Sequence, residues 1–328
     1  MYSQKNYYDT LENPYLIDIE DKLEYSNEEL NNIQKLLKDK YIDYIIEEEF
    51  NENFKWSFSW VRDRCAKGLT MTIIDLSNNI LPTKNLFKIG DGGDSKNCFV
   101  CYSSLNTDRN DFSKTMVQSL EEVGFNGHFY LFNGGFPNPT GTEMKFVGVP
   151  YSFKIFMMLE AQKKGFEKVI WLDAACYAVN NPQRLFDILK EDDAIFNLIY
   201  PHVLEPDPNI DFYDLVVLPS TIKLMTKLMG RNIKEDINVN SVVFGLNLCS
   251  SKIQNFIKEY YELVKIGLPF LSTFPEEFVF ASIFNKPEYK YVFNYNRCEI
   301  DKLYINEHYL NKLQSKEHGF YFLQRRYN

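Results

Sequence analysis

The sequence predicts an α/β protein with a mostly parallel sheet flanked by helices, preceded by an N-terminal, mainly helical extension. Two observations support this prediction. From residue 96 onward, short apolar runs alternate with segments of helical period, an order typical of parallel strands joined by crossover helices. The first 95 residues lack this alternation. We therefore expect two domains, an extension over residues 1–95 and a main domain over residues 96–328.

The main domain is expected to begin with a strand at residues 98–102 and a polar loop at residues 103–109. Ser113 is a typical helix cap, and Gly124 ends the helix that follows it. Periodic apolar runs predict the remaining elements. We expect strands at residues 128–132, 169–172, 194–200, 289–294 and within 238–247, and helices at residues 153–161, 183–190, 220–229, 250–265 and 276–285.

The strand at residues 169–172 is apolar throughout and ends at Asp173. Open α/β sheets bind their ligands at the carboxyl ends of their strands. A carboxylate at this position is therefore a candidate ligand-binding group. The alternative is a core strand that happens to end in Asp, and these residues alone leave both interpretations open.

The N-terminal extension contains one clear helix signal. Ser26 and Glu29 have the spacing of a capping box, and apolar residues then repeat at helical spacing to about residue 48. The apolar face of such a helix needs a partner. That partner is either the main domain or a second copy of the chain, so a homodimer through this helix is one expectation.

A loop or hinge is expected at residues 78–96, which contain Pro82 and a Gly-rich run at residues 90–94. It places the domain boundary near residue 95. A Gly-rich run directly after a strand would suggest a Rossmann-type methyltransferase or oxidoreductase. Here the run precedes the strand at residues 98–102, which disfavours that class.

The composition excludes several classes of function. The net charge is −9 and no basic stripe occurs, so we expect no nucleic-acid partner. No window approaches the ~18 apolar residues that a membrane span requires. A strand would direct Cys98 and Cys101 to opposite faces, which argues against a metal or redox pair. We expect reduced thiols and a cytoplasmic protein, in the host cytoplasm if the AT-rich coding bias reflects a virus.

Four segments in the main domain occur in a recognisable order. They are residues 99–104, residues 150–154 with the later V-I-W-L-D-A strand, residues 240–247 and residues 274–278. Together they resemble glycosyltransferases of the GT-A fold, over roughly residues 96–300. The resemblance implies that the main domain has this fold, with a nucleotide-sugar donor, a UDP-sugar, and a glycan or protein-linked sugar as acceptor. It leaves open whether the reaction retains or inverts the anomeric configuration.

The sequence departs from this family at the expected D-x-D motif. Asp173 supplies the first carboxylate, but Ala175 stands in place of the second. The family's pair holds Mn²⁺ or Mg²⁺ against the diphosphate, because these cations prefer oxygen ligands. Three interpretations remain open. Asp173 binds a metal with help from a later residue such as His318, or cationic Lys154 and Arg109 replace the metal. In the third, the chain is a catalytically inactive protein that binds nucleotides or glycans.

The resemblance also implies roles for individual residues. Glu276 or Glu277 is the expected catalytic carboxylate, with Asp214 on a long Pro-rich loop as an alternative base. First-turn acids also stabilise a helix N-terminus, and that structural interpretation of the two glutamates is equally open. Asn240 and Asn247 are candidate acceptor-binding residues. The residues expected to bind the donor are Ser103, Ser104, Asn106, Arg109, Lys154 and Asp173.

Overall fold

The structure is a computed structural model, and it describes only part of the chain. The described residues are 83–103, 107–133, 149, 151–199, 213, 217, 219–270, 272, 274–289, 292 and 300–325. The helix expected at residues 26–48 therefore lies outside the described residues, as do Ser104, Asn106 and Asp214. Arg109 belongs to a described helix, but its side chain is outside the description.

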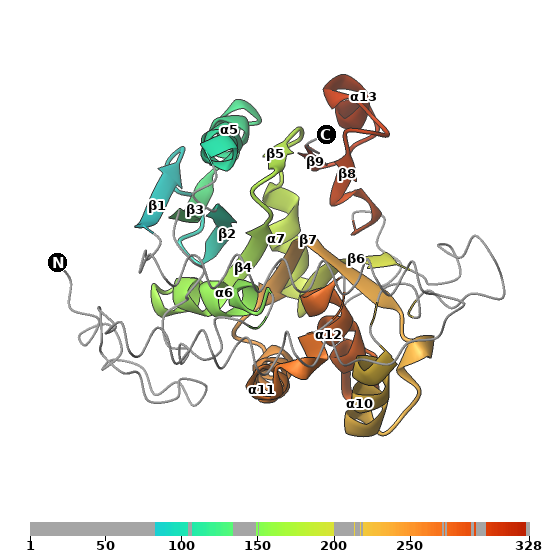
Figure 1. The fold of residues 1–328 in the computed structure, drawn as a ribbon. Coiled ribbons are helices and arrows are strands. Elements are labelled where there is room, and N and C mark those ends of the chain that lie inside the picture. The colour runs from blue at the N-terminus through green and yellow to red at the C-terminus, as the bar shows by residue number, and fades with distance from the viewer. Residues whose placement is uncertain are drawn as a thin grey trace, which may run out of the picture.

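A six-stranded sheet has the order β1-β3-β2-β4-β7-β6 (Figure 1). Its strands are β1 (Thr83–Ile89), β2 (Asn97–Ser103), β3 (Gly127–Asn133), β4 (Lys168–Leu172), β6 (Ala194–Ile199) and β7 (Asn238–Asn247). β2 is parallel to β3 and to β4, while β7 is antiparallel to both β4 and β6. β6 therefore points the same way as β2, β3 and β4. The expected α/β class with a mostly parallel sheet is confirmed.

β1 corrects the loop expected at residues 78–96. Residues 83–89 form an edge strand that pairs antiparallel with β3. Two lysines and an asparagine interrupt this segment, and Leu86 is 47% exposed, so its apolar alternation is too weak to predict a strand. The Gly-rich turn follows it, where Gly93 with φ 49° approaches the Asn126 backbone so closely that a Cβ would clash. Because β1 belongs to the sheet, the sheet already includes residues on the N-terminal side of the boundary expected near residue 95.

Helices cover both faces of the sheet (Figure 1). They are α5 (Thr107–Glu122), α6 (Phe153–Lys163), α7 (Gln183–Glu191), α10 (Pro219–Met229), α11 (Ser251–Ile266) and α12 (Pro275–Phe284). One core cluster joins α6, α10, α11 and α12 to the face that carries Cys98 and Trp171. The other joins α5 and α7 to the face that carries Cys101 and Leu172. The prediction that the two cysteines point to opposite faces is confirmed.

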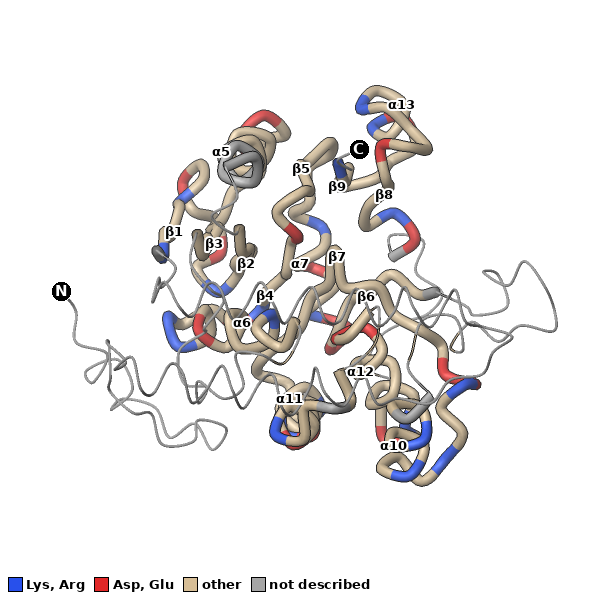
Figure 2. Tube along the Cα trace, in the orientation of Figure 1, with Lys and Arg blue, Asp and Glu red and all other residues tan. Residues whose placement is uncertain are grey.

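Helix α6 is buried on nearly all sides although it contains charged residues. Its buried stretch runs from Lys154 to Ala161 and includes Glu160. Figure 2 shows both basic and acidic residues on this helix. Buried charges are stable only when they are paired and hydrogen-bonded. The partners of these two residues therefore decide what each end of α6 does.

A smaller sheet, with the order β5-β9-β8, packs against the core cluster that contains Cys101 and Leu172. It consists of β5 (Cys176–Ala178), β8 (Tyr304–Asn306) and β9 (Phe322–Gln324), and α13 (Lys312–Glu317) lies beside it (Figure 1). Arg325 continues the β9 pairing, because its backbone N–H donates to the Ala175 carbonyl over 2.9 Å. This C-terminal segment thus supports the turn that follows Asp173.

Short 3-10 helices connect the longer elements. They are η4 (Ile233–Glu235), η5 (Leu268–Phe270), η6 (Pro287–Tyr289) and η7 (Ile300–Lys302). The strand expected at residues 289–294 is wrong at its two described residues, because Tyr289 ends η6 and Val292 lies in a bend. The Val292 carbonyl nevertheless accepts a hydrogen bond from the Ala194 backbone. No helix in the described part of the chain is both long and apolar enough to cross a bilayer.

Candidate functional site

Asp173 lies directly after β4, at the carboxyl end of that strand. Its backbone N–H donates to the Val242 carbonyl over 2.9 Å, and its own carbonyl accepts from Cys176. Trp171 is buried, as expected, and its indole N–H donates to Asp173 Oδ1 over 2.7 Å. The Asp173 side chain is still 31% exposed. The carboxylate is therefore held in one orientation while part of it faces solvent.

Two further carboxylates approach from the first turn of α12. Pro275 starts the helix, and Glu276 and Glu277 follow it in the buried first turn. Both are bound by Ser241, which stands on β7 beside the end of β4. The Ser241 backbone N–H donates to Glu277 Oε1 over 2.8 Å, and the Ser241 hydroxyl lies 2.6 Å from Glu276 Oε1. These bonds dock the helix start against the sheet.

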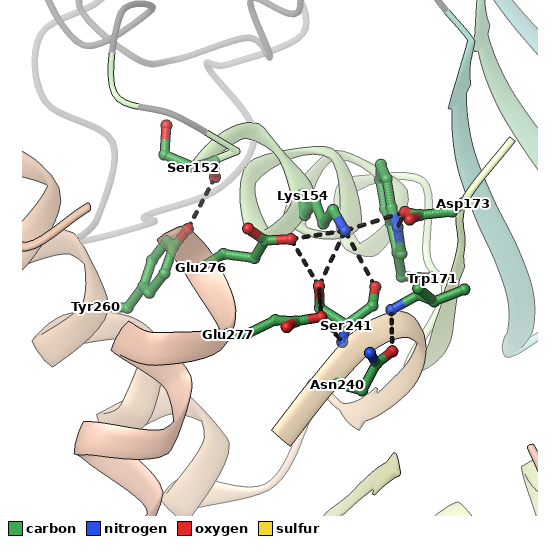
Figure 3. A network of polar contacts seen from close by, with 10 residues as sticks. Ser152, Lys154, Trp171, Asp173, Asn240, Ser241, Tyr260, Glu276 and Glu277 are labelled. Atoms are coloured by element: carbon green, nitrogen blue, oxygen red, sulfur yellow. Dashed lines mark hydrogen bonds and ion pairs between the residues drawn. The ribbon is translucent and has the colours of Figure 1, made fainter. Parts of the chain in front are cut away.

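Lys154 joins these carboxylates (Figure 3). Its Nζ lies 3.0 Å from Asp173 Oδ1 and 2.7 Å from Glu276 Oε1. It also lies 3.1 Å from both the carbonyl and the hydroxyl oxygen of Ser241. The Lys154 side chain is only 3% exposed. One buried ammonium therefore connects α6, the end of β4, β7 and the start of α12.

The charges in this cluster shift the proton affinities of its members. Burial alone would lower the pKa of Lys154. The negative charges of Asp173 and Glu276 raise it by more than burial lowers it, so the pKa of Lys154 lies above its ordinary value. Burial raises the pKa of Glu277, and the neighbouring Glu276 raises it more, against the opposing effect of the Ser241 hydrogen bonds. The cluster thus contains a permanently charged lysine and a carboxyl group that favours its protonated form. Shifted carboxyl groups of this kind are candidates for proton transfer.

Tyr304 approaches the same cluster from the C-terminal sheet. It is a partly buried residue of β8 that packs against the core cluster containing Cys176. Burial raises the pKa of its phenol, and the charges of Glu277, Cys176 and Asp173 raise it further. Neither Tyr304 nor Ser241 was predicted as a site residue from the sequence. Ser241 lies inside the segment that resembles the family, whereas a three-residue strand gives Tyr304 no local signal.

Four of the predicted site residues meet in this cluster, namely Lys154, Asp173, Glu276 and Glu277. Ser103 ends β2, the neighbour of β4, and is buried at the same carboxyl edge. His318 caps the C-terminus of α13 and is exposed. Ser104, Asn106 and Asp214 lie outside the described residues, and the Arg109 side chain is not described. The roles of all these residues stay predictions.

The described residues do not fit a metal site built on paired carboxylates. Among them, no group of three or more His, Cys, Asp or Glu side chains could hold a metal ion. Ala175 has no side-chain oxygen to offer. A divalent ion on Asp173 Oδ1 would also lie beside the Lys154 ammonium, 3.0 Å from that oxygen. The ion and the ammonium would then share one carboxylate oxygen, and two positive charges that lie so close repel each other strongly.

No known protein family matches the sequence, and no curated protein is similar to it in sequence. Solved structures that resemble the chain include glycosyltransferases. Mouse xyloside xylosyltransferase 1 is 11% identical, with a TM-score of 0.40 over 69% of this chain and 96% of its own. The galactosyltransferase LgtC is 12% identical, with a TM-score of 0.39 over 70% and 86%. A glycosyltransferase of PBCV-1 capsid glycosylation is 14% identical, with a TM-score of 0.30 over 69% and 93%.

At these identities and TM-scores, the similarity does not identify a family or an activity for this chain.

Proposed function

We propose that the protein is a GT-A glycosyltransferase that moves a sugar from a UDP-sugar to a hydroxyl of a glycan or protein-linked sugar. The observation that supports this most is the joining of Asp173 to Glu276 by the buried Lys154 ammonium. The cluster stands at the carboxyl edge of the sheet, where open α/β sheets bind ligands. Burying several carboxylates beside one cation is unfavourable for folding alone. A ligand-binding role accounts for that arrangement.

Asp173 is proposed to contact the donor, because its side chain is more exposed to solvent than those of Lys154 and Glu276, with which it is clustered. A carboxylate accepts hydrogen bonds from ribose or sugar hydroxyls. Ser103 lies at the same edge, and Ser104, Asn106 and Arg109 follow it in the chain. These residues are proposed to form the nucleotide loop. The residues of the site thus come from the ends of neighbouring strands.

The reaction breaks the bond between the anomeric carbon and the diphosphate oxygen and forms a bond from that carbon to the acceptor oxygen. The acceptor hydroxyl loses its proton to a base, and UDP leaves with the bonding electron pair. The transition state resembles an oxocarbenium ion, which a nearby carboxylate stabilises. We assign this carboxylate to Glu276 or Glu277, with Asp214 as the alternative base. Which of them acts decides whether the configuration is retained or inverted.

The charge of the diphosphate can be balanced in two ways. Mn²⁺ or Mg²⁺ with Asp173 and His318 among its ligands, as the family resemblance implies, would supply a Lewis acid, but no three described His, Cys, Asp or Glu side chains could hold it. Arg109 and Lys154 would instead supply side-chain cations. The Lys154 ammonium already contacts Asp173, Glu276 and Ser241, so a phosphate contact would have to replace one of these. Activity in Mn²⁺ and in EDTA separates the two routes.

The function is tested by incubating the pure protein with a panel of UDP-sugars and sugar acceptors, with Mn²⁺ or with EDTA, and measuring UDP release. We expect slow donor hydrolysis without acceptor and faster release with a suitable one. Asp173→Asn should lose at least about a hundredfold of this activity. Glu160→Gln, a second buried acid outside the cluster, is the matched control and should stay near the wild-type rate. Donor binding without any turnover across the panel would contradict the enzyme.

A second candidate is a catalytically inactive protein that binds nucleotides or glycans on the same fold. The replacement of the second motif carboxylate by Ala175 and the full set of protein contacts at Lys154 favour it. In this case Asp173→Asn weakens UDP binding in calorimetry, and the wild-type protein releases no UDP. Turnover of any donor decides for the enzyme.

Location and assembly remain parts of this proposal. We propose the cytoplasm, or the host cytoplasm if the source is a virus, because the described cysteines are free thiols: Cys98, Cys101, Cys176 and Cys249. A homodimer through residues 26–48 is proposed on the apolar period of that segment alone. Sedimentation of the full chain and of a variant with charged residues on that face tests it.

A further inference from the structure

Tyr151, just before α6, has an unusual backbone conformation. Its φ is 57°, and in the described part of the chain it is the one residue other than glycine with a positive φ. In this region the Cβ of a bulky residue collides with its own backbone, which a glycine would avoid. Such strained residues persist where the surrounding structure enforces them, and they cluster at ligand sites.

The Tyr151 side chain is also exposed beside the polar cluster. It is 46% exposed, whereas Ser152 and Lys154 are 4% and 2% exposed. The Lys154 Nζ lies 5.6 Å from the centre of the Tyr151 ring. Because that ammonium contacts Asp173 and Glu276, the exposed ring lies at the edge of the carboxylate cluster. The strained backbone thus holds a large aromatic group out toward solvent next to charged groups.

Neighbouring aromatic rings pack in a row that begins at Tyr151. Its ring centre lies 5.9 Å from that of Phe153, which packs in turn on Trp171 at 6.0 Å and on Tyr102 at 5.1 Å. Trp171 donates its indole N–H to Asp173. The row of rings therefore extends from the exposed Tyr151 to the carboxylate. An aromatic surface that is rigid before binding loses little entropy when a ligand packs on it.

We propose that Tyr151 is a sugar-binding platform, on which the apolar face of a pyranose packs while the hydroxyls of that sugar reach the exposed part of the Asp173 carboxylate. A pyranose has the required chemistry, because it combines a face of C–H groups with a rim of hydroxyl groups. Tyrosine suits such ligands, since it offers a broad apolar face and a polar tip. This inference rests on the proposed function for the source of the sugar, which is either the transferred sugar of the donor or the acceptor.

Calorimetric titration of the full chain tests the platform without requiring turnover. The probes are UDP, UDP-glucose, UDP-galactose, and the methyl glycosides of glucose, galactose, mannose and xylose. We expect saturable binding of at least one glycoside, or tighter binding of a UDP-sugar than of UDP. Tyr151→Ala should weaken that sugar-dependent binding about tenfold, the effect of about 1.4 kcal/mol, and leave UDP affinity within twofold. Tyr151→Phe should retain it.

Two comparisons separate the ring from the backbone. Tyr151→Gly relieves the left-handed strain that Tyr151→Ala keeps, so the glycine variant should melt at the higher temperature. Both variants should lose the same sugar affinity, because both lack the ring. Tyr309→Ala removes a tyrosine that is 78% exposed near α13 and should leave sugar binding unchanged.

The platform and the proposed function can fail separately. Glycoside binding that depends on Tyr151, in a protein that turns over no donor, supports the platform and contradicts the proposed transferase activity. If the protein turns over a donor and Tyr151→Ala leaves the KM for every sugar unchanged, the platform is contradicted and the proposed transferase activity is supported. The platform is also overturned if the wild-type protein shows no sugar-dependent binding, or if Tyr151→Ala weakens UDP and sugar equally.

Discussion

Helix α6 carries two buried charged residues of opposite sign, and their surroundings differ. Lys154 contacts Asp173 and Glu276 at the carboxyl edge of the sheet. Glu160, 2% exposed, pairs with Lys84 of the edge strand β1 and accepts from the Tyr130 hydroxyl over 3.2 Å. The first cluster has more acids than bases. The second joins a single acid to basic residues at a sheet edge.

The two clusters also shift proton affinities in opposite directions. Near Lys154, burial and Glu276 raise the pKa of Glu277. Near Glu160, burial lowers the pKa of Lys163 to about 8, Glu160 opposes this effect, and Lys84 adds to it. A buried charge by itself is therefore weak evidence for function. The informative features are an excess of one sign, a position at the carboxyl ends of strands, and contributions from several elements.

Removing the central cation should have the largest effect. Lys154→Met leaves Asp173 and Glu276 without their shared partner, and breaking a buried ion pair in this way costs about 3–5 kcal/mol. We expect that loss in urea unfolding, together with loss of UDP release. Lys154→Arg keeps the charge and is the matched control. A Lys154→Met protein as stable as the wild type would show that the cluster does not stabilise the fold.

Activity should separate the two buried glutamates. Glu276→Gln keeps the shape of the side chain but removes the negative charge, and kcat should fall by about 10²–10⁴-fold if Glu276 acts on the reacting sugar or its proton. Glu160→Gln should leave kcat within about twofold, because Glu160 lies in the other cluster. Steady-state UDP release measures both. Equal losses in the two variants would indicate that the glutamates act through stability alone.

The pH dependence of stability should have opposite signs at the two clusters. The pKa of Glu277 is raised in the folded state, so its contribution is present below the ordinary value of 4.5 and is lost as the pH rises through the folded-state pKa. The pKa of Lys163 is lowered from 10.5 to about 8, so its contribution is present above 10.5 and is lost as the pH falls through about 8.

Urea unfolding at pH 5 to pH 10 checks these slopes, each unit of pKa shift corresponding to about 1.4 kcal/mol. Glu277→Gln should flatten the decline above pH 4.5, and Lys163→Met should flatten the rise between about pH 8 and pH 10.5. The reverse assignment, with Glu277→Gln acting only in the alkaline window, would refute the shift at Glu277.

The smallest effect is expected at the edge of the sheet. The Lys84 side chain is 33% exposed, so its pair with Glu160 is partly screened by solvent. Lys84→Met should cost about 1 kcal/mol and leave UDP release unchanged. A shift of the unfolding midpoint without a change in slope measures this. A loss of activity would mean that β1 influences the site.

The parts of the fold that could be predicted from sequence are those with local signals. The strand at residues 169–172 is apolar on both faces, and the end of β4 followed from it directly. The three-residue strands β5, β8 and β9 have no period of their own and depend on partners far along the chain. β1 was missed because an edge strand with exposed lysines lacks clear alternation.

Four of the residues proposed from the sequence lie together in one cluster, but their contacts could not be predicted. The resemblance brought forward Asp173, Glu276 and Glu277, yet spacing along the chain gives no distance between residues that lie about a hundred positions apart. Lys154 was expected to face the phosphates, because a lysine can hold a phosphate through charge-assisted hydrogen bonds. In the structure it is buried and paired with two carboxylates. Only the packing of α6 and α12 on the sheet determines that pairing.

The pairing of β5 with β9 makes the turn after Asp173 depend on a distant segment. In the described part of the chain, residues 176–178 gain their strand partner from residues 322–324, and the Ala175 carbonyl gains its donor from Arg325. Synthesis at about 5–20 residues per second separates the emergence of these two segments from the ribosome by about 7 to 30 seconds. During that interval β4 can already pair with β2 and then with β7, while residues 176–178 still lack their β9 partner. A nascent chain of this protein would therefore complete its sheet before it completes its site.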